Sequence, residues 1–570
     1  MNQATVAHRL WSLVATSALC VAVGCTGTMM AGGASRPGPD GGGAGPGGGT
    51  LSDINTPFVP EPLGMRRLLA WQYQAAVSDL LGADAALATT PPTDTAINGF
   101  DAVGAGQIAL GTTDLQLYEA SGMAAAKVAL ANAASRARLV PCTPTGKGDS
   151  GCMAAVVQGL APRAYRRALE SSETNAWLSL GLTAASAYGD FYKGAQTVVA
   201  GLLQSANFLY LVELGQPEPT TPGTLRLTGP EMANRLAFFL TGAPPDALLA
   251  AAGQNGTLGT ADGIRTQAAR LLKTPQARAA FAHFFDERLH LRDLSTVIKD
   301  ATLFPNFTPA LAQAMRSETL RLLADVIWDS NSDFRTVFTA NYTFVNKALA
   351  ALYGMPSPAT DTLTRTPYPA GSGRMGLLSQ ASLLSAVSHP SATSPTRRGK
   401  MVREDIFCSP IAAPPVGVNT TLPPAPPDHP MTTRDRMLLL HQSDPSCAAC
   451  HKLMDNVGFA FEHFDAIGQY RKTEGTLAID DSGNVDALTF QGAEGLGKLV
   501  ASDERMTRCL VRNLFRQGAG HIDAAGEMGP LARVDVVFKN GGYKLQDAIV
   551  EVVASDAFRF GRLAEGQPVP

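Results

Sequence analysis

Five consecutive residues, Cys447-Ala448-Ala449-Cys450-His451, constrain this chain more than any other feature of its sequence. Two thiols three residues apart lie on one face of a helical turn, where both can form thioether bonds with one macrocycle. The adjacent imidazole of His451 can then bind the central iron as the proximal ligand. With 8 cysteines in 570 residues, chance produces this pattern far less than once per chain. The motif predicts one covalently attached haem c, held by Cys447 and Cys450.

The same motif is also compatible with a zinc half-site or a C-x-x-C redox pair. A zinc site needs two further ligands at a suitable spacing. The sequence contains no second C-x-x-C and no pair of histidines three to five residues apart. Haem is therefore the favoured interpretation.

The sixth iron ligand decides what such a haem does, because methionine opposite histidine favours electron transfer, whereas an open position permits peroxide or oxygen chemistry. Met506 and Met528 follow the motif at distances that suit a small cytochrome. We favour Met528, in its Gly-Glu-Met-Gly-Pro setting, although each methionine is also a common core residue. His441 is the third candidate, and it could ligate iron, contact a propionate or end its helix.

The N-terminus predicts export. Residues 1–25 have the organisation of a signal peptide, with an apolar run from Leu10 to Val23 that is too short to remain as a membrane span. The residues before Cys25 resemble a bacterial lipoprotein cleavage box, which makes Cys25 the predicted lipidation site. An ordinary soluble exported protein is the alternative, because Ala22 stands where such boxes usually carry leucine. Residues 26–55 are glycine-rich and predict a disordered tether. We therefore expect a lipid-anchored protein of the periplasm or cell envelope.

Size and charge limit the other possibilities. A mature chain of this length exceeds a single core, so two to four domains are expected. The formal net charge of -3 gives no reason to expect nucleic acid as a partner. The most apolar later stretch, about Thr197 to Leu214, is interrupted by polar residues and predicts a buried helix, with a membrane span as the lesser alternative.

Four cysteines remain after the signal peptide, the lipid site and the motif are assigned. In an oxidising compartment they predict two disulfides. Cys142 and Cys152 flank a short polar loop, so we pair them with each other and pair Cys408 with Cys509. Free buried thiols are the alternative.

Helical periodicity dominates the chain and predicts a mainly α fold, a large multi-helical body followed by a small cytochrome c-like haem unit. The predicted helices are 63–82, 114–134, 153–169, 190–214, 227–241, 262–273, 276–290, 308–327, 343–352 and 376–386. The predicted domains are 56–135 (N-terminal helical), 136–215 (helical, with Cys142 and Cys152), 216–356 (central helical), 357–431 (a proline-rich connecting segment with a basic helix) and 432–570 (the haem domain).

Within the last unit, Thr433 is the expected cap of a helix that runs to about His441. Asp444 and Pro445 then supply a cap and a first-turn proline for the helix that carries the motif.

A resemblance covers nearly the whole mature chain. RRLLAWQYQAAVSDLLG (66–82), LRLTGPEMANRLAFFL (225–240), RMGLLSQASLL (374–384) and SPTRRGKMVREDIFC (394–408) resemble segments of the planctomycete cytochrome C-like family, which also occurs in myxobacteria. These are large exported proteins of five consecutive domains of unknown function. In the family, C-x-x-C-H is followed by Asp-x-x-Gly-Phe, here Asp455 to Phe459, with Asn456 where proline is usual. The resemblance implies the fold, export and haem, and it supplies no reaction.

Two further groups of charged residues are weaker candidates. Arg397, Arg398, Lys400 and Arg403 could bind haem propionates or another anion, although a solvated or ion-paired face is the more common role of such a run. Glu462 and Asp465 could act as paired carboxylates, or serve as surface charges and cap partners.

Three functions follow from these observations. The first is a cell-envelope c-type haem protein that transfers electrons to or from an unknown redox partner, with the helical body as its support or docking part. The second is a haem oxidoreductase or peroxidase with an open iron position. The third is a surface binding or scaffold lipoprotein without catalytic activity.

Overall fold

The computed structural model describes residues 54–413, 422, 425–426, 428–443 and 445–564. Helices dominate them and strands are short, so the predicted mainly α fold is confirmed. The predicted signal peptide, Cys25, nearly all of the tether 26–55 and part of the proline-rich segment lie outside the described residues.

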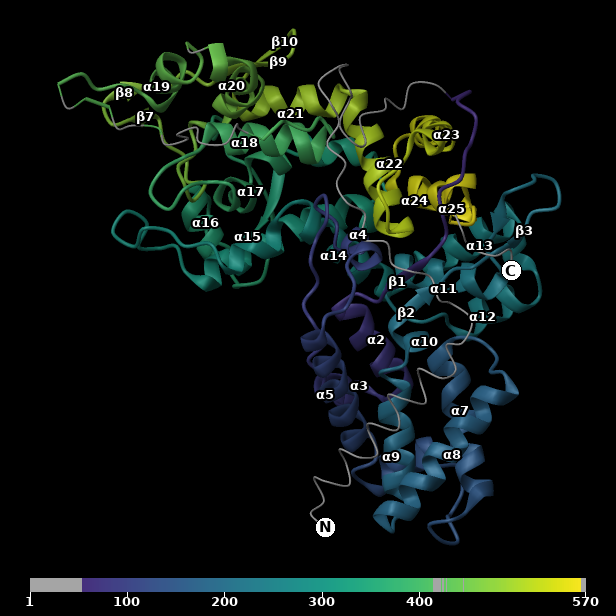
Figure 1. Cartoon of the computed structure of the whole chain (residues 1–570). Coiled ribbons are helices and arrows are strands. Elements are labelled where there is room, and N and C mark those ends of the chain that lie inside the picture. Colours follow the sequence, from purple (N-terminus) through teal and green to yellow (C-terminus); the bar gives the residue numbers. More distant parts are fainter. Residues whose placement is uncertain (1–53, 414–421, 423–424, 427, 444, 565–570) are drawn as a thin grey trace.

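The first helices form a narrow column that extends downward in Figure 1. They are α2 (Ala70–Leu81), α3 (Ala83–Leu87), α4 (Asp101–Gln107), α5 (Thr112–Ala129), α6 (Ala133–Leu139), α7 (Ser150–Tyr165), α8 (Ser171–Tyr188), α9 (Phe191–Leu202) and α10 (Ala206–Leu209). All of them except α4 contribute to one apolar core, whereas α4 packs against α22 and the strand at 65–67. The predicted disulfide Cys142–Cys152 is present at the start of α7.

A second group of helices joins the middle of the chain to its end. It contains α11 (Gly229–Leu240), α12 (Ala247–Gln254), α13 (Ala261–Leu271), α14 (Pro275–Arg288), α22 (Glu504–Ala519), α23 (Met528–Asn540), α24 (Leu545–Ala554) and α25 (Asp556–Arg559). These helices contribute to a single apolar core. Helices that belong to the predicted haem unit 432–570 therefore pack with the central body, and the domain boundaries stay a prediction.

A third group forms a lobe on the other side of the column. It contains α15 (Pro309–Ala324), α16 (Lys347–Tyr353), α17 (Ala381–Ala386), α18 (Pro395–Met401), α19 (Thr433–Leu440), α20 (Pro445–Gly458) and α21 (Gly492–Ser502). Single tight or wide helical turns complete the chain: η1 (Thr257–Gly259), η2 (Leu291–Ser295), η3 (Asp325–Asp329), η4 (Phe334–Phe338), η5 (Leu377–Ser379), η6 (Val402–Ile406), η7 (Phe459–Phe461) and η8 (Ala525–Glu527). The second predicted disulfide, Cys408–Cys509, links the end of η6 to α22.

The strands are short and antiparallel. The pairs are β1 (Met65–Arg67) with β2 (Tyr210–Val212), β5 (Tyr342–Val345) with β6 (Thr364–Pro367), β7 (Thr473–Glu474) with β8 (Leu477–Ala478), and β9 (Ser482–Val485) with β10 (Leu488–Gln491). A three-stranded sheet has the order β11 (Phe560–Gly561), β4 (Leu225–Arg226), β3 (Gln216–Pro217).

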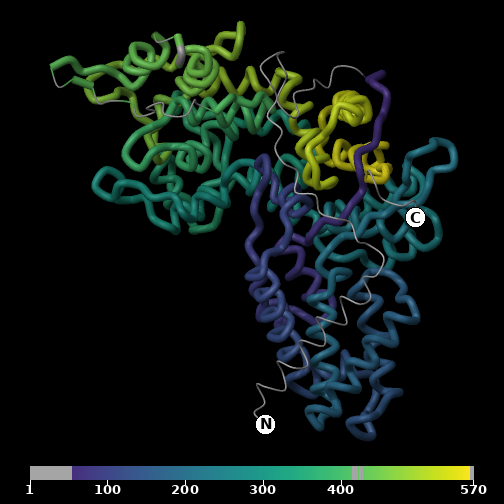
Figure 2. The backbone as a smooth tube through the Cα atoms, in the orientation of Figure 1, coloured from purple at the N-terminus to yellow at the C-terminus, as the bar shows by residue number. Residues whose placement is uncertain are grey.

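Both ends of the described chain meet in the same place. The backbone N–H of Val59 donates to the carbonyl of Gly526, and that of Leu63 donates to the carbonyl of Arg562. Figure 2 shows this first segment, in purple, running beside the yellow C-terminal helices. The last helices are thus held by the first residues as well as by the central body.

Several helices begin where the sequence places a hydroxyl before a proline. Thr274, Thr308 and Ser394 cap α14, α15 and α18, and a proline follows each cap. Thr228 caps α11, and Glu231 completes its capping box. Helix α19 is capped by Thr432, one residue before the predicted Thr433, because Asp435 lies where a capping box requires it.

Three predicted helices are shorter than expected because part of each pairs as a strand. Met65–Arg67 forms β1 instead of the start of the helix 63–82, and its partner β2 ends the predicted helix 190–214 early. Residues 342–345 form β5, so α16 starts only after Asn346. The stretch Thr197–Leu214 thus divides among α9, α10 and β2 and is largely buried. None of the helices among the described residues has the length and apolar character that a membrane crossing requires.

Candidate functional site

The motif lies on α20. Cys447, Cys450 and His451 are each partly exposed, and the two thiols stand outside the disulfides found in the described chain. The spacing of three and four residues places all three side chains along one side of the helix. The sequence prediction that the motif occupies a helix is confirmed.

A buried carboxylate lies behind His451. Asp455 is one helical turn further along α20 and fully inaccessible to solvent. A hydrogen bond of 2.9 Å joins Nδ1 of His451 to Oδ2 of Asp455. The hydroxyl of Thr396 on α18 donates to Oδ1 of the same carboxylate at 2.7 Å. An ionised carboxylate can only accept, so this contact assigns the proton to Nδ1 of His451 and leaves Nε2 of the neutral ring with a free lone pair.

A second imidazole lies against His451. His441 follows the last residue of α19, and the two ring centroids are 4.3 Å apart. Nδ1 of His441 is buried without a hydrogen-bond partner among the described residues. Burial lowers the pKa of His441, and the neighbouring His451 lowers it further, while Asp455 acts in the opposite direction. The potential ligand atoms of these three residues lie within 4.8 Å of one another.

Close contact with α18 holds α20 in place. A Cβ on Gly399 would lie 1.8 Å from the carbonyl oxygen of Met454, and one on Gly458 would lie 1.9 Å from that of Pro395. Each glycine therefore lets the two backbones touch. This contact brings Thr396 to Asp455.

Other contacts fix the C-terminal half of α20. The guanidinium of Arg403 donates to the carbonyl of Leu453 and pairs with Asp486 at 2.8 Å. Asn456 donates to the side chain of Asn484 in β9, and it accepts from Gln442, the residue after His441.

The basic stretch divides into buried and exposed residues. Arg398 is completely buried and donates to the carbonyls of Phe461, Phe464 and Asp465, so it cannot reach an external anion. Arg403 is also buried, while Arg397 and Lys400 are exposed. The predicted cluster of four cations for a propionate does not form as one surface.

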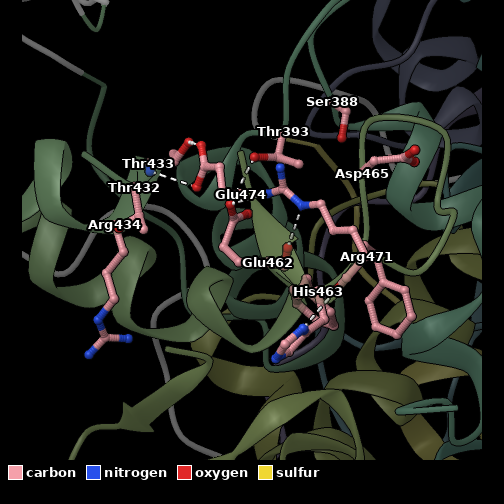
Figure 3. A network of polar contacts seen from close by, with 12 residues as sticks. Ser388, Thr393, Thr432, Thr433, Arg434, Glu462, His463, Asp465, Arg471 and Glu474 are labelled. Atoms are coloured by element: carbon pink, nitrogen blue, oxygen red, sulfur yellow. Dashed lines mark hydrogen bonds and ion pairs between the residues drawn. The ribbon is translucent and has the colours of Figure 1, made fainter. Parts of the chain in front are cut away.

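The predicted carboxylate pair is likewise built into the fold. Glu462 is buried, accepts from Thr393 at 2.9 Å and pairs with Arg471 at 3.1 Å. Figure 3 shows this network from close by, with Glu474 accepting from Thr433 nearby. Asp465 accepts the backbone N–H groups of Ile467 and Gln469, so it stabilises the turn that follows and caps no helix.

The two methionine candidates lie elsewhere. Met506 and Met528 are buried in the apolar core of the central helices, on α22 and α23. Met506 faces a small apolar cavity that Phe284, Phe338 and Leu510 also line. Figure 1 shows α23 well separated from α20, with α21 between them. Among the three proposed sixth ligands, His441 is the one that the structure brings to His451.

Sequence reasoning noticed Asp455 only as part of a family resemblance and did not single out Thr396. The signal for Asp455 was its position four residues after His451 on a predicted helix, where two side chains lie one above the other. The contact from Thr396 depends on a packing of two helices far apart in sequence, which local patterns do not indicate.

The fold and the site define a class, a large and mainly helical protein with a C-x-x-C-H sequence on one helix. Five protein-family models match consecutive segments, each described as a protein of unknown function: DUF1587 at 66–133, DUF1595 at 152–213, DUF1592 at 227–355, DUF1588 at 374–474 and DUF1585 at 486–558. No curated protein and no solved structure matches the chain. The chain belongs to the planctomycete cytochrome C-like family, as the sequence resemblance indicated.

Proposed function

We propose that this protein is a c-type haem protein of the cell envelope that transfers single electrons. Cys447 and Cys450 would hold the haem through two thioether bonds, and Nε2 of His451 would be its proximal ligand. The observation that carries the proposal is the arrangement on α20. Two partly exposed thiols precede an imidazole whose other nitrogen is already committed to a buried carboxylate. Metal-bound histidines usually have such a partner.

The surface around the motif suits a large apolar group. Four leucines beside it are exposed although they are apolar: Leu438, Leu439, Leu440 and Leu453, with 39%, 58%, 40% and 40% of their surface accessible. Three of them lie on α19 directly before His441, and Leu453 lies on α20 between Cys450 and Asp455. Clustered exposed apolar residues mark a binding surface. A macrocycle attached to α20 would cover part of this surface.

We propose His441 as the sixth ligand. Its Nδ1 is buried and lacks a partner among the described residues, and its ring contacts that of His451. Because the rings touch, a macrocycle with one imidazole on each face requires α19 to move away from α20. Met506 and Met528 would each have to leave a packed core.

The haem would supply a one-electron change between ferric and ferrous iron. The residues of the chain would do the rest. His451 would bind the iron, Asp455 would keep the proton on Nδ1, and the leucines of α19 would shield one side from water. The helical body would support α20 and offer a docking surface for a redox partner.

One observation favours a second candidate function, a haem oxidoreductase with an open iron position. An imidazole that donates to a buried carboxylate is a stronger donor of electron density to iron, which assists reactions with peroxide. The two candidates differ in whether His441 binds the iron.

We also propose export and anchoring of the chain. Residues 1–25 would direct export, Cys25 would carry lipid, and residues 26–55 would tether the folded part to a membrane of the envelope. The two disulfides of the described chain are in accord with folding in an oxidising compartment.

The decisive experiment is a haem stain of the full chain exported from cells that express a cytochrome c maturation system. The wild type is expected to stain after denaturation, and Cys447→Ser with Cys450→Ser is expected to abolish the stain. The matched control is Cys142→Ser with Cys152→Ser, which removes a disulfide-bonded pair of cysteines elsewhere in the chain and should leave the stain. Equal staining of all three proteins, or none in the wild type, would refute covalent haem and leave a binding or scaffold protein.

Absorption spectra then separate the two haem functions. A low-spin spectrum that becomes high-spin in His441→Ala supports electron transfer with two histidine ligands. Met506→Leu and Met528→Leu are the controls and should leave the spectrum unchanged. A wild-type spectrum that is already high-spin and changes when cyanide is added would favour the oxidoreductase.

A further inference from the structure

We infer that Thr396, Asp455 and His451 form a hydrogen-bonded chain that sets the reduction potential of the iron, with Asp455 as its positioning residue. This inference rests on the proposed function, because it concerns the iron that His451 would bind. It adds a role for α18, whose basic residues are a candidate site for haem propionates.

The geometry of the three hydrogen-bonded residues supports this role. Asp455 has no exposed surface, and its two oxygens accept from two different donors, Nδ1 of His451 at 2.9 Å and the hydroxyl of Thr396 at 2.7 Å. The carboxylate can neither turn away nor exchange its partners for water. The imidazole plane is therefore held in one orientation, with Nε2 left for the iron.

The electronic consequence follows from the charge. A carboxylate that accepts the Nδ1 proton gives the imidazole partial anionic character and raises its basicity toward a metal. A more basic ligand stabilises ferric iron relative to ferrous iron. The reduction potential of the iron is therefore lower than it would be with a neutral acceptor behind the ring. The hydroxyl of Thr396 acts in the opposite direction, because a second donor takes up part of the negative charge of Asp455.

The packing of α18 against α20 explains why this hydrogen-bonded group is rigid. Thr396 and Gly399 are three residues apart on α18, and Asp455 and Gly458 are three residues apart on α20. Each hydrogen-bonding residue thus stands one turn from the glycine at which the two backbones touch. A movement that separated the helices would break the bond between Thr396 and Asp455.

The structure also contains a second buried pair of a threonine and a carboxylate, Thr393 and Glu462, which has no imidazole partner. Thr393 donates to Glu462 at 2.9 Å, and Glu462 is buried like Asp455, but its charged partners are Arg471 at 3.1 Å and Arg398 at 3.8 Å. Variants of this second pair change a buried threonine or carboxylate without touching His451. They therefore separate an effect on the iron from a general effect of core substitution.

The test is a spectroelectrochemical titration of the full-length haem protein with the variants Asp455→Asn and Thr396→Val. Asp455→Asn is expected to lower the ratio of ferric to ferrous protein at a fixed potential about tenfold, a rise of about 59 mV for one electron. Thr396→Val is expected to shift the ratio in the opposite direction. Glu462→Gln and Thr393→Val should leave it within about twofold.

A second measurement does not require haem. In the haem-free protein, nitrogen NMR of His451 is expected to show a proton fixed on Nδ1, and Asp455→Asn should yield a mixture of tautomers.

The outcomes are distinct. A wild type without covalent haem refutes the proposed function and removes this inference with it. A haem protein in which Asp455→Asn leaves the potential unchanged, or in which Asp455→Asn and Thr396→Val shift it in the same direction, refutes the inference alone. Equal shifts in Asp455→Asn and Glu462→Gln do the same, because they would show a nonspecific effect of removing a buried carboxylate.

Discussion

The contact between α18 and α20 makes Gly399→Ala the most informative single substitution. The added Cβ would lie 1.8 Å from the carbonyl oxygen of Met454, whereas ordinary contacts begin at 3.4 Å. The two backbones must therefore separate by about 1.6 Å, the difference between these distances. The neighbour is backbone, so no side-chain rotation relieves the overlap.

The expected cost follows from this overlap. Overpacking a core by one methyl group costs about 1–3 kcal/mol, and contact with a rigid backbone places Gly399→Ala at about 3 kcal/mol. The matched control is Gly159→Ala in the middle of α7, where an added Cβ meets no atom within 4 Å. Alanine there should stabilise the helix by about 0.5–1 kcal/mol, because it restricts the unfolded chain.

Hydrogen exchange of backbone amides is the appropriate assay, since a chain of several packed segments does not unfold in one step. In Gly399→Ala, the protected amides of α18 and α20 should exchange about 100-fold faster, because each 1.4 kcal/mol corresponds to a factor of ten. In Gly159→Ala, those of α7 should exchange about two- to fivefold more slowly. Exchange in α20 within fivefold of the wild type would show that the helices part easily and would refute the argument from backbone contact.

Three further predictions concern other parts of the fold. Replacing Cys408 and Cys509 by serine removes the disulfide that closes a loop of about 100 residues, and it should destabilise the chain by about 3–5 kcal/mol in denaturant unfolding. A reduced wild type as stable as the oxidised wild type would contradict this prediction. Arg398→Met should lower the unfolding free energy by about 3–5 kcal/mol, because the buried carbonyls and Glu462 lose the guanidinium that pairs with them. Arg397→Met, at the exposed neighbouring residue, should change the unfolding free energy by less than about 0.5 kcal/mol. Similar losses in the two variants would contradict the argument from the burial of Arg398. Burial raises the pKa of Glu318 to about 7 from its ordinary 4.5, so the folded state keeps a proton that the unfolded state releases, and the contribution of Glu318 to stability should fall as pH rises from about 4.5 to 7. Glu318→Gln should flatten that part of the profile of unfolding free energy against pH, and an unchanged slope would assign the dependence to other groups.

Local signals in the sequence predicted many of the helices and both disulfides. The short polar loop between Cys142 and Cys152 indicated their pairing, and helical periodicity indicated α11 within the predicted 227–241. The signals failed where distant segments compete with local periodicity. Met65–Arg67 continues a helical pattern, yet it pairs with β2 about 145 residues later, and nothing near residue 65 encodes that partner.

For the candidate site, too, local sequence predicted some features and missed those that depend on distant segments. The motif and its helix were evident from the sequence, because adjacent residues carry the chemistry. The depth of Asp455 and the donor Thr396 were not, because both depend on the contact between α18 and α20. The position of Arg398 was also not evident from the sequence. Its charge indicated a residue at the surface, whereas the structure buries it completely.

The preference for Met528 fails for a reason that also bears on the proposed function. It assumed that residues 432–570 enclose the haem as one unit, but α22 packs with α11, α24 packs with α13, and α23 lies against α22 and α24. The elements packed against α20 include α18, β9 and η7, and His441 at the end of α19 contacts His451. A haem on α20 would therefore be covered by few elements, and more of its edge would face solvent than in a cytochrome that surrounds its haem. An exposed edge shortens the path to a docked partner, which suits electron transfer better than chemistry that requires a closed pocket.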